Sequence, residues 1–268
     1  MATAGSAGPV DRGSAPAVGR AVRVLGLLAE ARGRPLGISD IARALGIAKS
    51  SMSNLLVALE EGRLVERTDA GYLLGRRTVE LGGAYLATFD QVREFYKVCG
   101  ESPVLNRELV QLAVLDRTDV LYLARHEGRA PLRLSAGIGD RYPASLTAVG
   151  KALLARLTPA EVAVRFADPA SRPRWTERSE TSLEGLQRDL ARVRERGWSL
   201  DEGQVHPLVV GVAMAVPPRV SGEQAFAVGV SMISSAPTDP EPSDEHRKRV
   251  VDELASAVQR LTNPMLPE

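Results

Sequence analysis

The sequence has one cysteine and no long hydrophobic run, and each scarcity excludes a class of protein. Because Cys99 stands alone, an intrachain disulfide framework and a multi-cysteine metal site are both excluded. No apolar run approaches the roughly 20 residues that a membrane helix needs. The opening residues also lack the apolar core of a signal peptide. We therefore expect a cytoplasmic protein with no membrane partner.

Catalytic signatures are missing as well. The chain has three histidines, His126, His206 and His246, and none of them belongs to an H-E-x-x-H zinc motif. A G-x-S-x-G nucleophile elbow, a Walker loop and a G-x-G-x-x-G fingerprint are also absent. We predict no catalytic residue, no metal and no cofactor, and a hydrolytic enzyme is the weaker alternative.

What the sequence does contain is an uneven distribution of charge. Its 268 residues are 44% hydrophobic and 25% charged, which is typical of a soluble protein with two domains. Residues 18–77 hold ten Lys or Arg and six Asp or Glu, for a net charge of +4. Residues 1–17 are neutral and the whole chain carries +1, so the rest carries −3. A basic first domain favours contact with a polyanion, although ordinary scatter in charge explains +4 equally well.

Residues 39–59, S-D-I-A-R-A-L-G-I-A-K-S-S-M-S-N-L-L-V-A-L, have the pattern of two short helices joined by a tight turn. Ser39 is a natural N-cap for the first helix. Ala42 lies where the helices approach each other, and Gly46 supplies the positive φ that the turn needs. This is the pattern of a helix-turn-helix unit.

The second helix of this unit is predicted to begin near Lys49 and to divide into two faces. Its buried stripe is Met52, Leu55, Leu56 and Leu59. Its polar face consists of Lys49, Ser50, Ser51, Ser53 and Asn54. A helix with this division can lie in the major groove of DNA with its amino end toward the base edges.

A short two-strand hairpin is predicted next, from Leu64–Arg67 and Thr68–Leu74, and its pattern indicates a wing. Its flanking arginines could neutralise phosphates, which supply affinity without sequence information; they are Arg63, Arg67, Arg76 and Arg77. An ordinary solvated basic face is the alternative.

The predicted domains are a disordered arm (1–16), a winged helix-turn-helix domain (17–77), a linker helix or helix pair (78–100) and a second domain (101–268). The second domain has strand candidates at 109–115, 119–126, 132–136, 209–216 and 226–233. Helices are predicted at 147–155, from Pro159, from Leu183 to Gly197, and after a Ser243 N-cap. The fold class is α+β, with a mainly antiparallel sheet.

Several segments in this order resemble one family. They are I-A-R-A-L-G-I-A-K-S-S-M-S-N-L-L-V-A-L-E, G-R-L-V-E-R, G-Y-L-L-G, L-A-V-L-D-R-T-D-V-L-Y-L-A-R-H-E-G, L-T-A-V-G-K-A-L-L-A and R-E-R-G-W-S-L-D. The chain resembles the IclR (isocitrate lyase regulator) family of bacterial transcriptional regulators. The resemblance implies a winged helix that binds double-stranded operator DNA, a linker helix used in dimerisation, and a GAF-like domain that binds a small effector. It also implies dimers, often paired into tetramers, on a partly palindromic operator.

The effector site is expected at the start of the helix at 147–155, because unpaired backbone N–H groups there favour a carboxylate. The residues concerned are Thr147, Ala148, Val149 and Gly150. The resemblance adds Asp201, Gly211, Gly229 and Ser231 to the pocket. Gly229 and Ser231 alternate along one strand and therefore share a face. Asp201 as a turn cap and Ser231 as a bond to a neighbouring strand are the structural alternatives.

Two glycines depart from the family pattern. Members often have a polar or thiol residue at the position of Gly211 and a hydroxyl at that of Gly229. We therefore expect more room and an effector larger or more apolar than a small keto acid, such as an aromatic acid or related amide. The substitution Gly229→Leu is expected to abolish the effector response and to spare operator binding.

Four further polar residues near the expected site are left open or are assigned a structural role. Lys151 is expected to be a solvated cation and His206 an exposed loop residue, while Arg133 and Arg141 are unassigned at the pocket entrance. A repressor is the expected form of the protein. The remaining alternative is a DNA-binding protein whose second domain only oligomerises.

Overall fold

The computed structural model describes residues 15–128, 136–220, 222–233 and 244–263. They belong to two compact units, residues 1–88 and 89–268. Most of the expected arm, Arg133, most of the strand expected at 132–136, and the expected cap Ser243 lie outside the described residues.

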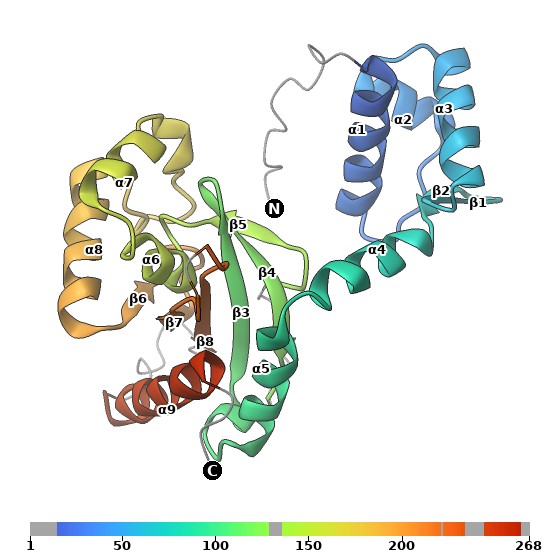
Figure 1. Cartoon of the computed structure of the whole chain (residues 1–268). Helices are drawn as coiled ribbons and strands as arrows, with labels where there is room; N and C mark the ends of the chain where they lie inside the picture. Colours follow the sequence, from blue (N-terminus) through green and yellow to red (C-terminus); the bar gives the residue numbers. More distant parts are fainter. Residues whose placement is uncertain (1–14, 129–135, 221, 234–243, 264–268) are drawn as a thin grey trace. The chain divides into compact units, whose positions relative to one another are not determined.

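The first unit is a small helical bundle with a two-strand hairpin (Figure 1). Its elements are α1 (Pro16–Glu30), α2 (Ile38–Leu45), α3 (Lys49–Glu61), β1 (Val65–Thr68), β2 (Gly71–Leu74) and α4 (Arg77–Leu86). Ile41, Met52 and Leu56 are fully buried at its centre, and Val24 of α1 packs against them. The expected helix pair and wing are therefore present.

Helix α2 follows the sequence expectation at its carboxyl end and departs from it at its amino end. Gly46 ends α2 with φ of 63°, a left-handed conformation that a glycine adopts without steric cost. The N-cap of α2, however, is Gly37, and Ser39 lies inside the first turn. The prediction of Ser39 as the cap was wrong, because residues near a helix start that favour capping are also tolerated within the first turn.

The wing is held close to the rest of the unit by two glycines. Thr68 pairs with Gly71 at the tip, and Leu36 bridges to Tyr72 on the outer side of the hairpin. A Cβ atom at Gly71 would lie 2.6 Å from the carbonyl oxygen of Leu36, and one at Gly75 would lie 2.2 Å from that of Arg63. Only glycine allows backbone to approach backbone so closely at these positions.

The second unit is built on a six-stranded, fully antiparallel sheet with the strand order β5-β4-β3-β8-β7-β6. The strands are β3 (Leu109–Asp116), β4 (Asp119–His126), β5 (Arg141–Pro143), β6 (Ser199–Glu202), β7 (Val209–Val216) and β8 (Phe226–Ile233). The expected strands at 109–115, 119–126, 209–216 and 226–233 are confirmed. Strands β5 and β6 were missed, because three or four residues are too few to show an alternating pattern, and Ala136 lies outside any strand.

Helices cover both faces of this sheet (Figure 1). They are α5 (Asp90–Glu101), α6 (Ala148–Leu154), α7 (Pro159–Arg165), α8 (Leu183–Arg196) and α9 (Asp244–Thr262), with short 3-10 turns at Leu105–Arg107 and Pro169–Ser171. Helix α6 packs on β7 and β8 from one side, and α9 packs on them from the other.

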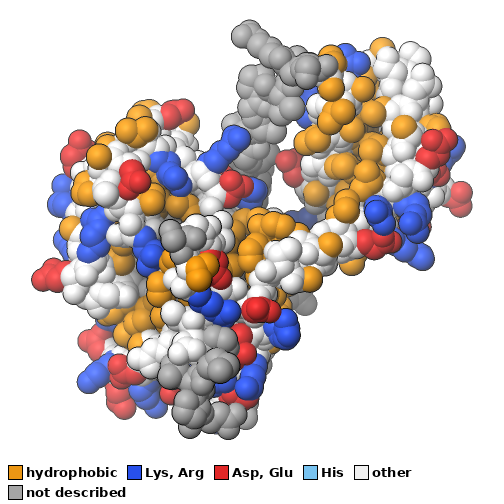
Figure 2. Space-filling model, in the orientation of Figure 1, with side chains coloured by type: hydrophobic (Ala, Val, Ile, Leu, Met, Phe, Trp, Pro, Cys, Tyr) orange, Lys and Arg blue, Asp and Glu red, His pale blue; other side chains and the backbone are white. Residues whose placement is uncertain are grey.

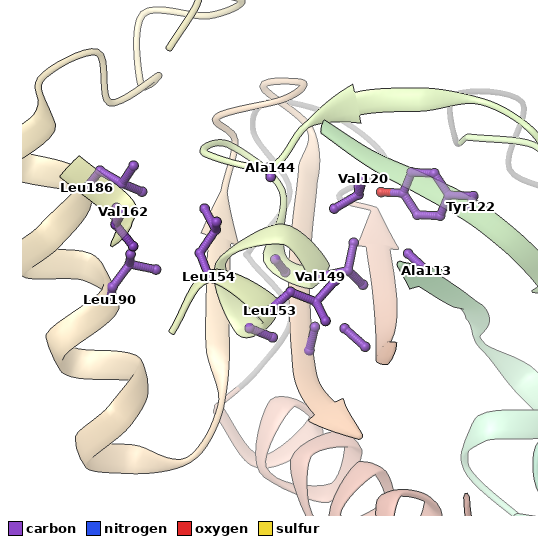
Figure 3. Packing of buried hydrophobic residues seen from close by; sticks show 14 of the residues in the cluster. Ala113, Val120, Tyr122, Ala144, Val149, Leu153, Leu154, Val162, Leu186 and Leu190 are labelled. Atoms are coloured by element: carbon purple, nitrogen blue, oxygen red, sulfur yellow. The ribbon is translucent and has the colours of Figure 1, made fainter. Parts of the chain in front are cut away.

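Helix α6 is the centre of the core of this unit (Figure 3). All seven of its residues are buried. Val149 and Leu153 point toward the sheet, while Leu154 lies on the side of Leu186 and Leu190 of α8. Because α6 is enclosed, the loop before it and the strands beneath it are held in place around its amino end.

Candidate functional site

The polar face of α3 is exposed along its first two turns. Met52, Leu56 and Leu59 are buried, whereas Leu55 is half-buried. The exposed residues on this part of the helix include all five that the sequence indicated: Lys49, Ser50, Ser51, Ser53 and Asn54. They give the first two turns of α3 an exposed set of hydrogen-bonding side chains.

The arginines of the wing flank this unit. Arg63, Arg67, Arg76 and Arg77 are exposed. Figure 2 shows basic side chains gathered where β2 ends and α4 begins. Arg77 makes an ion pair with Glu80 on the next turn of α4, with 2.5 Å between Nη1 and Oε2. Exposed pairs of this kind contribute little to stability, so Arg77 can exchange its partner for another anion.

A pocket opens in the second unit between the amino end of α6 and the central strands. The empty space in and in front of it, open solvent at the mouth included, is about 550 Å³. Its lining residues come from all six strands of the sheet, from the start of α6 and from the segments around them: Gln111, Tyr122, Ala136, Tyr142, Thr147, Ala148, Val149, Asp201, Val205, Val209, Gly211, Val212, Gly229, Val230 and Ser231.

Strand pairing determines the order of residues across the floor of this pocket. Asp201 of β6 pairs with Gly211 of β7, and Gly211 pairs with Ser231 of β8. Gln111 of β3 pairs with Gly229 of β8. Residues that pair directly on neighbouring strands point to the same face of the sheet. The polar side chains of Asp201 and Ser231 therefore lie on either side of Gly211.

Asp201 is buried, with 3% of its surface exposed, and one of its oxygens caps a turn. Its Oδ1 accepts a hydrogen bond of 2.7 Å from the backbone N–H of Gln204. Burial raises the pKa of Asp201 to about 6, against the lowering effects of the Gln204 and Val205 backbone groups and of Lys151. Asp201 therefore both holds a turn and presents an acceptor to the pocket.

Gln111 and Ser231 form the second polar group of the pocket. The Nε2 of Gln111 donates to the carbonyl oxygen of Ala136 at 2.8 Å, and Ser231 Oγ donates to Gln111 Oε1 at 3.3 Å. The carbonyl can only accept, so it sets the orientation of the amide and thereby the direction of the Ser231 hydroxyl. The sequence had indicated Ser231 but not Gln111, because a lone glutamine in an apolar strand carries no recognisable pattern.

Two aromatic rings stand at the side of the pocket and were also missed. Tyr122 and Tyr142 meet edge to face with their centroids 5.8 Å apart, and Trp175 meets Tyr142 in the same way at 5.3 Å. Burial raises the pKa of the Tyr122 phenol, so this phenol is neutral at physiological pH. Tyr142 belongs to β5, which the sequence did not predict.

Two family descriptions match most of the chain. Residues 17–69 match the IclR helix-turn-helix domain, and residues 101–261 match the bacterial transcriptional regulator IclR C-terminal domain. The chain belongs to the IclR family of bacterial transcriptional regulators. The two matches also account for the division into a DNA-binding unit and an effector-domain unit, and they identify a regulator rather than an enzyme.

Relatives of known name and structure agree with this assignment. The chain is 32% identical over 204 residues to the regulator XynR of Escherichia coli, which covers 74% of this chain and 79% of XynR. The repressor BlcR of Agobacterium tumefaciens is 30% identical, with a TM-score of 0.58 over 93% of this chain and 96% of BlcR. An IclR homologue of Microbacterium hydrocarbonoxydans, solved with 4-hydroxybenzoate, shares the fold at 24% identity and a TM-score of 0.75, over 92% and 97% of the two chains.

The amino end of α6 has fewer free donors than the sequence suggested for an IclR-type site. Thr147 caps the helix, and its Oγ1 accepts the N–H of Gly150 at 3.1 Å. In the first turn of α6, Gly150 and Lys151 donate their N–H groups to Thr147, and no partner within the described residues is found for the N–H groups of Ala148 and Val149. Asp201 also lies close by, since both Ala148 Cβ and Asp201 Cβ lie within 3.6 Å of a Cβ built at Gly211.

The two glycines that depart from the IclR pattern have different surroundings. A Cβ at Gly229 would lie 2.7 Å from Val149 Cγ1 and 3.0 Å from Ala213 Cβ, so α6 already fills the space. The expectation of more room at Gly229 was wrong, because α6 packs directly against β8 at the position where this glycine has no side chain. Gly211 does border the pocket, and its nearest neighbour would be Ala148 Cβ at 3.3 Å.

Lys151 was expected to be solvated, and the structure corrects this. Its Nζ donates to Asp189 Oδ2 at 3.0 Å and to the carbonyl oxygen of Leu200 at 3.3 Å, and the side chain is 2% exposed. Helical periodicity alone could not show that α6 is enclosed on every side. Lys151 therefore ties α6 to α8 and to β6, behind the pocket.

His206 and Arg141 are not among the residues that line the pocket. His206 was expected to be an exposed loop residue; it does lie in the loop before β7, but it is half-buried, and its Nδ1 accepts from the N–H of Leu208 at 3.3 Å. Arg141 is exposed and makes an ion pair with Asp116. In the described ranges, no group of three or more His, Cys, Asp or Glu is placed to hold a metal ion, and no helix is long and apolar enough to cross a bilayer.

Proposed function

We propose that this protein is a cytoplasmic, effector-controlled repressor that binds a partly palindromic operator as a dimer or a pair of dimers. The observation that carries the proposal is the presence in one chain of an exposed polar recognition helix and a buried pocket in a separate unit. Relatives named as repressors, including BlcR, support the sign of the regulation.

On the DNA side, the proposal assigns base reading to α3 and backbone contacts to the wing. Exposed side chains with short polar groups can reach base edges in the major groove: Lys49, Ser50, Ser51, Ser53 and Asn54. The arginines neutralise phosphates on both sides: Arg67, Arg76 and Arg77. Two copies related by a two-fold axis would match a palindromic site.

On the effector side, the pocket is proposed to bind a small organic acid or a related amide. The sequence-indicated residues all belong to the pocket lining except Gly150, which lies one residue beyond it. The aromatic side formed by Tyr122 and Tyr142 favours a ring in the ligand. That an IclR homologue was solved with 4-hydroxybenzoate supports an aromatic acid as the first candidate.

A selection experiment with the full chain tests the whole proposal. The protein is used to select its site from random DNA, and the selected duplex is then titrated with the protein in fluorescence anisotropy. A panel of aromatic and aliphatic acids and amides is added to the complex. We expect a selected site with two-fold symmetry and release by at least one compound. Failure to enrich any sequence would contradict the DNA-binding function.

The alternative, a second domain that only oligomerises, predicts a different result. Thermal denaturation with the same panel would then show no shift, since a ligand that binds only the folded state must raise the midpoint. We expect a concentration-dependent rise for a compound that also releases DNA.

A further inference from the structure

The two polar groups of the pocket differ in what they offer a ligand. Asp201 at one end is an acceptor, whereas Ser231 and Gln111 at the other end include donors. Gly211 lies between the two ends on the strand floor. Neighbouring strands are ~4.8 Å apart, so the backbones of Asp201 and Ser231 are separated by roughly 10 Å. A ligand that reaches both ends must lie across Gly211.

Resting on the proposed effector response, we infer that the pocket binds a planar aromatic molecule with a hydrogen-bond donor at Asp201 and an acceptor group at Ser231 and Gln111. A phenol with a carboxylate opposite its hydroxyl is the simplest member of this class. The carboxylate then lies away from the amino end of α6, the reverse of the orientation suggested by the sequence.

The acidic end requires a donor. The carboxylate of Asp201 accepts hydrogen bonds from the backbone N–H groups of Gln204 and Val205, and since its two oxygens together have about four lone-pair sites, it can accept a further donor. The described lining residues include no Lys, Arg or His, and the nearby Lys151 is bound to Asp189 and Leu200. A ligand carboxylate at this end would face a carboxylate with no cation between them, whereas a hydroxyl or amide N–H would be bound.

The opposite end suits an acceptor. Gln111 uses one of its two amide N–H groups for Ala136, and the second has no partner within the part of the chain that the structure describes, so it can bind a ligand. Arg125 pairs with Gln111 across β3 and β4, and its Nη1 lies 3.4 Å from the same carbonyl oxygen. This guanidinium adds positive potential behind Gln111, although Glu127, 3.0 Å from Arg125, reduces it.

The middle of the pocket suits a flat ring. The edge-to-face pair Tyr122 and Tyr142 offers an aromatic side, and Val149 and Val230 add apolar surface. Gly211 has no side chain, and Ala148 Cβ, which would lie 3.3 Å from a Cβ at this position, bounds the path between Asp201 and Ser231 on the side of α6. Residues with a polar or thiol side chain at this position would shorten that path.

The test compares matched ligands with the full-length protein. Isothermal titration calorimetry at pH 7.5 uses 4-hydroxybenzoate and 4-methoxybenzoate, which share the ring and the carboxylate but differ in the donor. We expect 4-hydroxybenzoate to bind at least about tenfold more tightly, because the methoxy group has no proton to donate to the carboxylate of Asp201. Equal affinity, a preference for the methoxy compound, or no binding of either at millimolar concentration would overturn the inference.

Two variants locate the ends of the ligand. Asp201→Asn keeps an oxygen for Gln204 and presents an N–H to the pocket, so it should reverse the preference toward 4-methoxybenzoate. Gln111→Glu should weaken 4-hydroxybenzoate at least about tenfold and spare neutral 4-hydroxybenzyl alcohol, since only the former meets a like charge. A reduction of equal size for both ligands in either variant would overturn the placement.

A control variant and an independent readout separate this inference from the proposed function. Glu202→Gln removes one negative charge from the exposed residue next to Asp201 and should leave the ligand preference unchanged. Operator binding by each variant shows that the fold is intact. If another class of small molecule releases the operator while both benzoates fail, the inference falls and the repressor function stands.

Discussion

Val149 fills the space that a side chain at Gly229 would need: a Cβ atom on the glycine would lie 2.7 Å from Cγ1 of the valine. The absent side chain lets α6 settle on β8, and the pocket forms at the amino end of that helix. Gly229 is thus part of the packing that supports the pocket rather than open space within it.

Gly229→Ala should therefore destabilise the second unit by about 1–3 kcal/mol, because an added methyl group overpacks the contact with Val149 and Ala213. Urea denaturation of the full chain measures the loss. Gly211→Ala serves as the control, since its nearest contact of 3.3 Å is with a methyl group at the border of the pocket. A smaller cost at Gly229 than at Gly211 would contradict this account. Gly229→Leu should prevent folding of the unit, so it cannot test the effector response selectively.

Lys151→Met should cost about 1–3 kcal/mol in free energy of unfolding, since it leaves Asp189 without its buried partner. The adjacent pair Arg192 and Asp189 offers a control, because Arg192 is 69% exposed and 3.5 Å from the same carboxylate. Arg192→Ala should change stability by less than about 0.5 kcal/mol. Similar losses for the two variants would show that the burial of Lys151 does not matter.

Asn54→Ala and Arg77→Ala should affect DNA binding differently. Asn54 is proposed to read a base, so its loss should weaken the selected site by about 1–3 kcal/mol and spare random DNA. Arg77 is proposed to contact phosphate, so its loss should weaken both and reduce the slope of log affinity against log salt by about one. Anisotropy titrations at several salt concentrations measure both effects. Equal losses on the two DNAs for Asn54→Ala would exclude base reading.

The free energy of unfolding should fall as pH rises through about 6, on account of Asp201. Its pKa rises from an ordinary value of 3.8, which applies to the unfolded chain, to about 6 in the folded protein. The folded state therefore binds more protons than the unfolded chain between pH 4 and pH 6. The stability that protonated Asp201 contributes below pH 4 is lost as the group ionises in the folded protein. Two pKa units correspond to at most about 3 kcal/mol.

Denaturation of the parent protein and of Asp201→Asn at pH 5 and pH 8 isolates this group. The difference in unfolding free energy, parent minus variant, should be smaller at pH 8. The charged neighbours Lys151 and Glu202 are unchanged in both proteins and cancel in the comparison. A pH-independent difference would show that the pKa of Asp201 is not raised.

The helix-turn-helix unit could be predicted from the sequence nearly residue by residue, because its signals are local. The position of Gly46, the buried stripe of Met52 and Leu56, and the polar face of α3 all follow from helical periodicity and from the conformational freedom of glycine. The long strands β3, β4, β7 and β8 were equally accessible, since eight-residue segments that are mostly apolar and bounded by turns have few alternatives.

The pocket was decided by the tertiary structure. Strand order brings Gln111 of β3 next to Ser231 of β8, which is 120 residues away in the chain. The enclosure of α6 turns Lys151 from an expected surface cation into a buried partner of Asp189. Periodicity reports which face of one element is apolar, but only packing determines which element covers that face. The sequence by itself thus determined the polar face of α3, to which we assign base reading, and long-range packing determined the chemistry of the pocket that we propose for the effector.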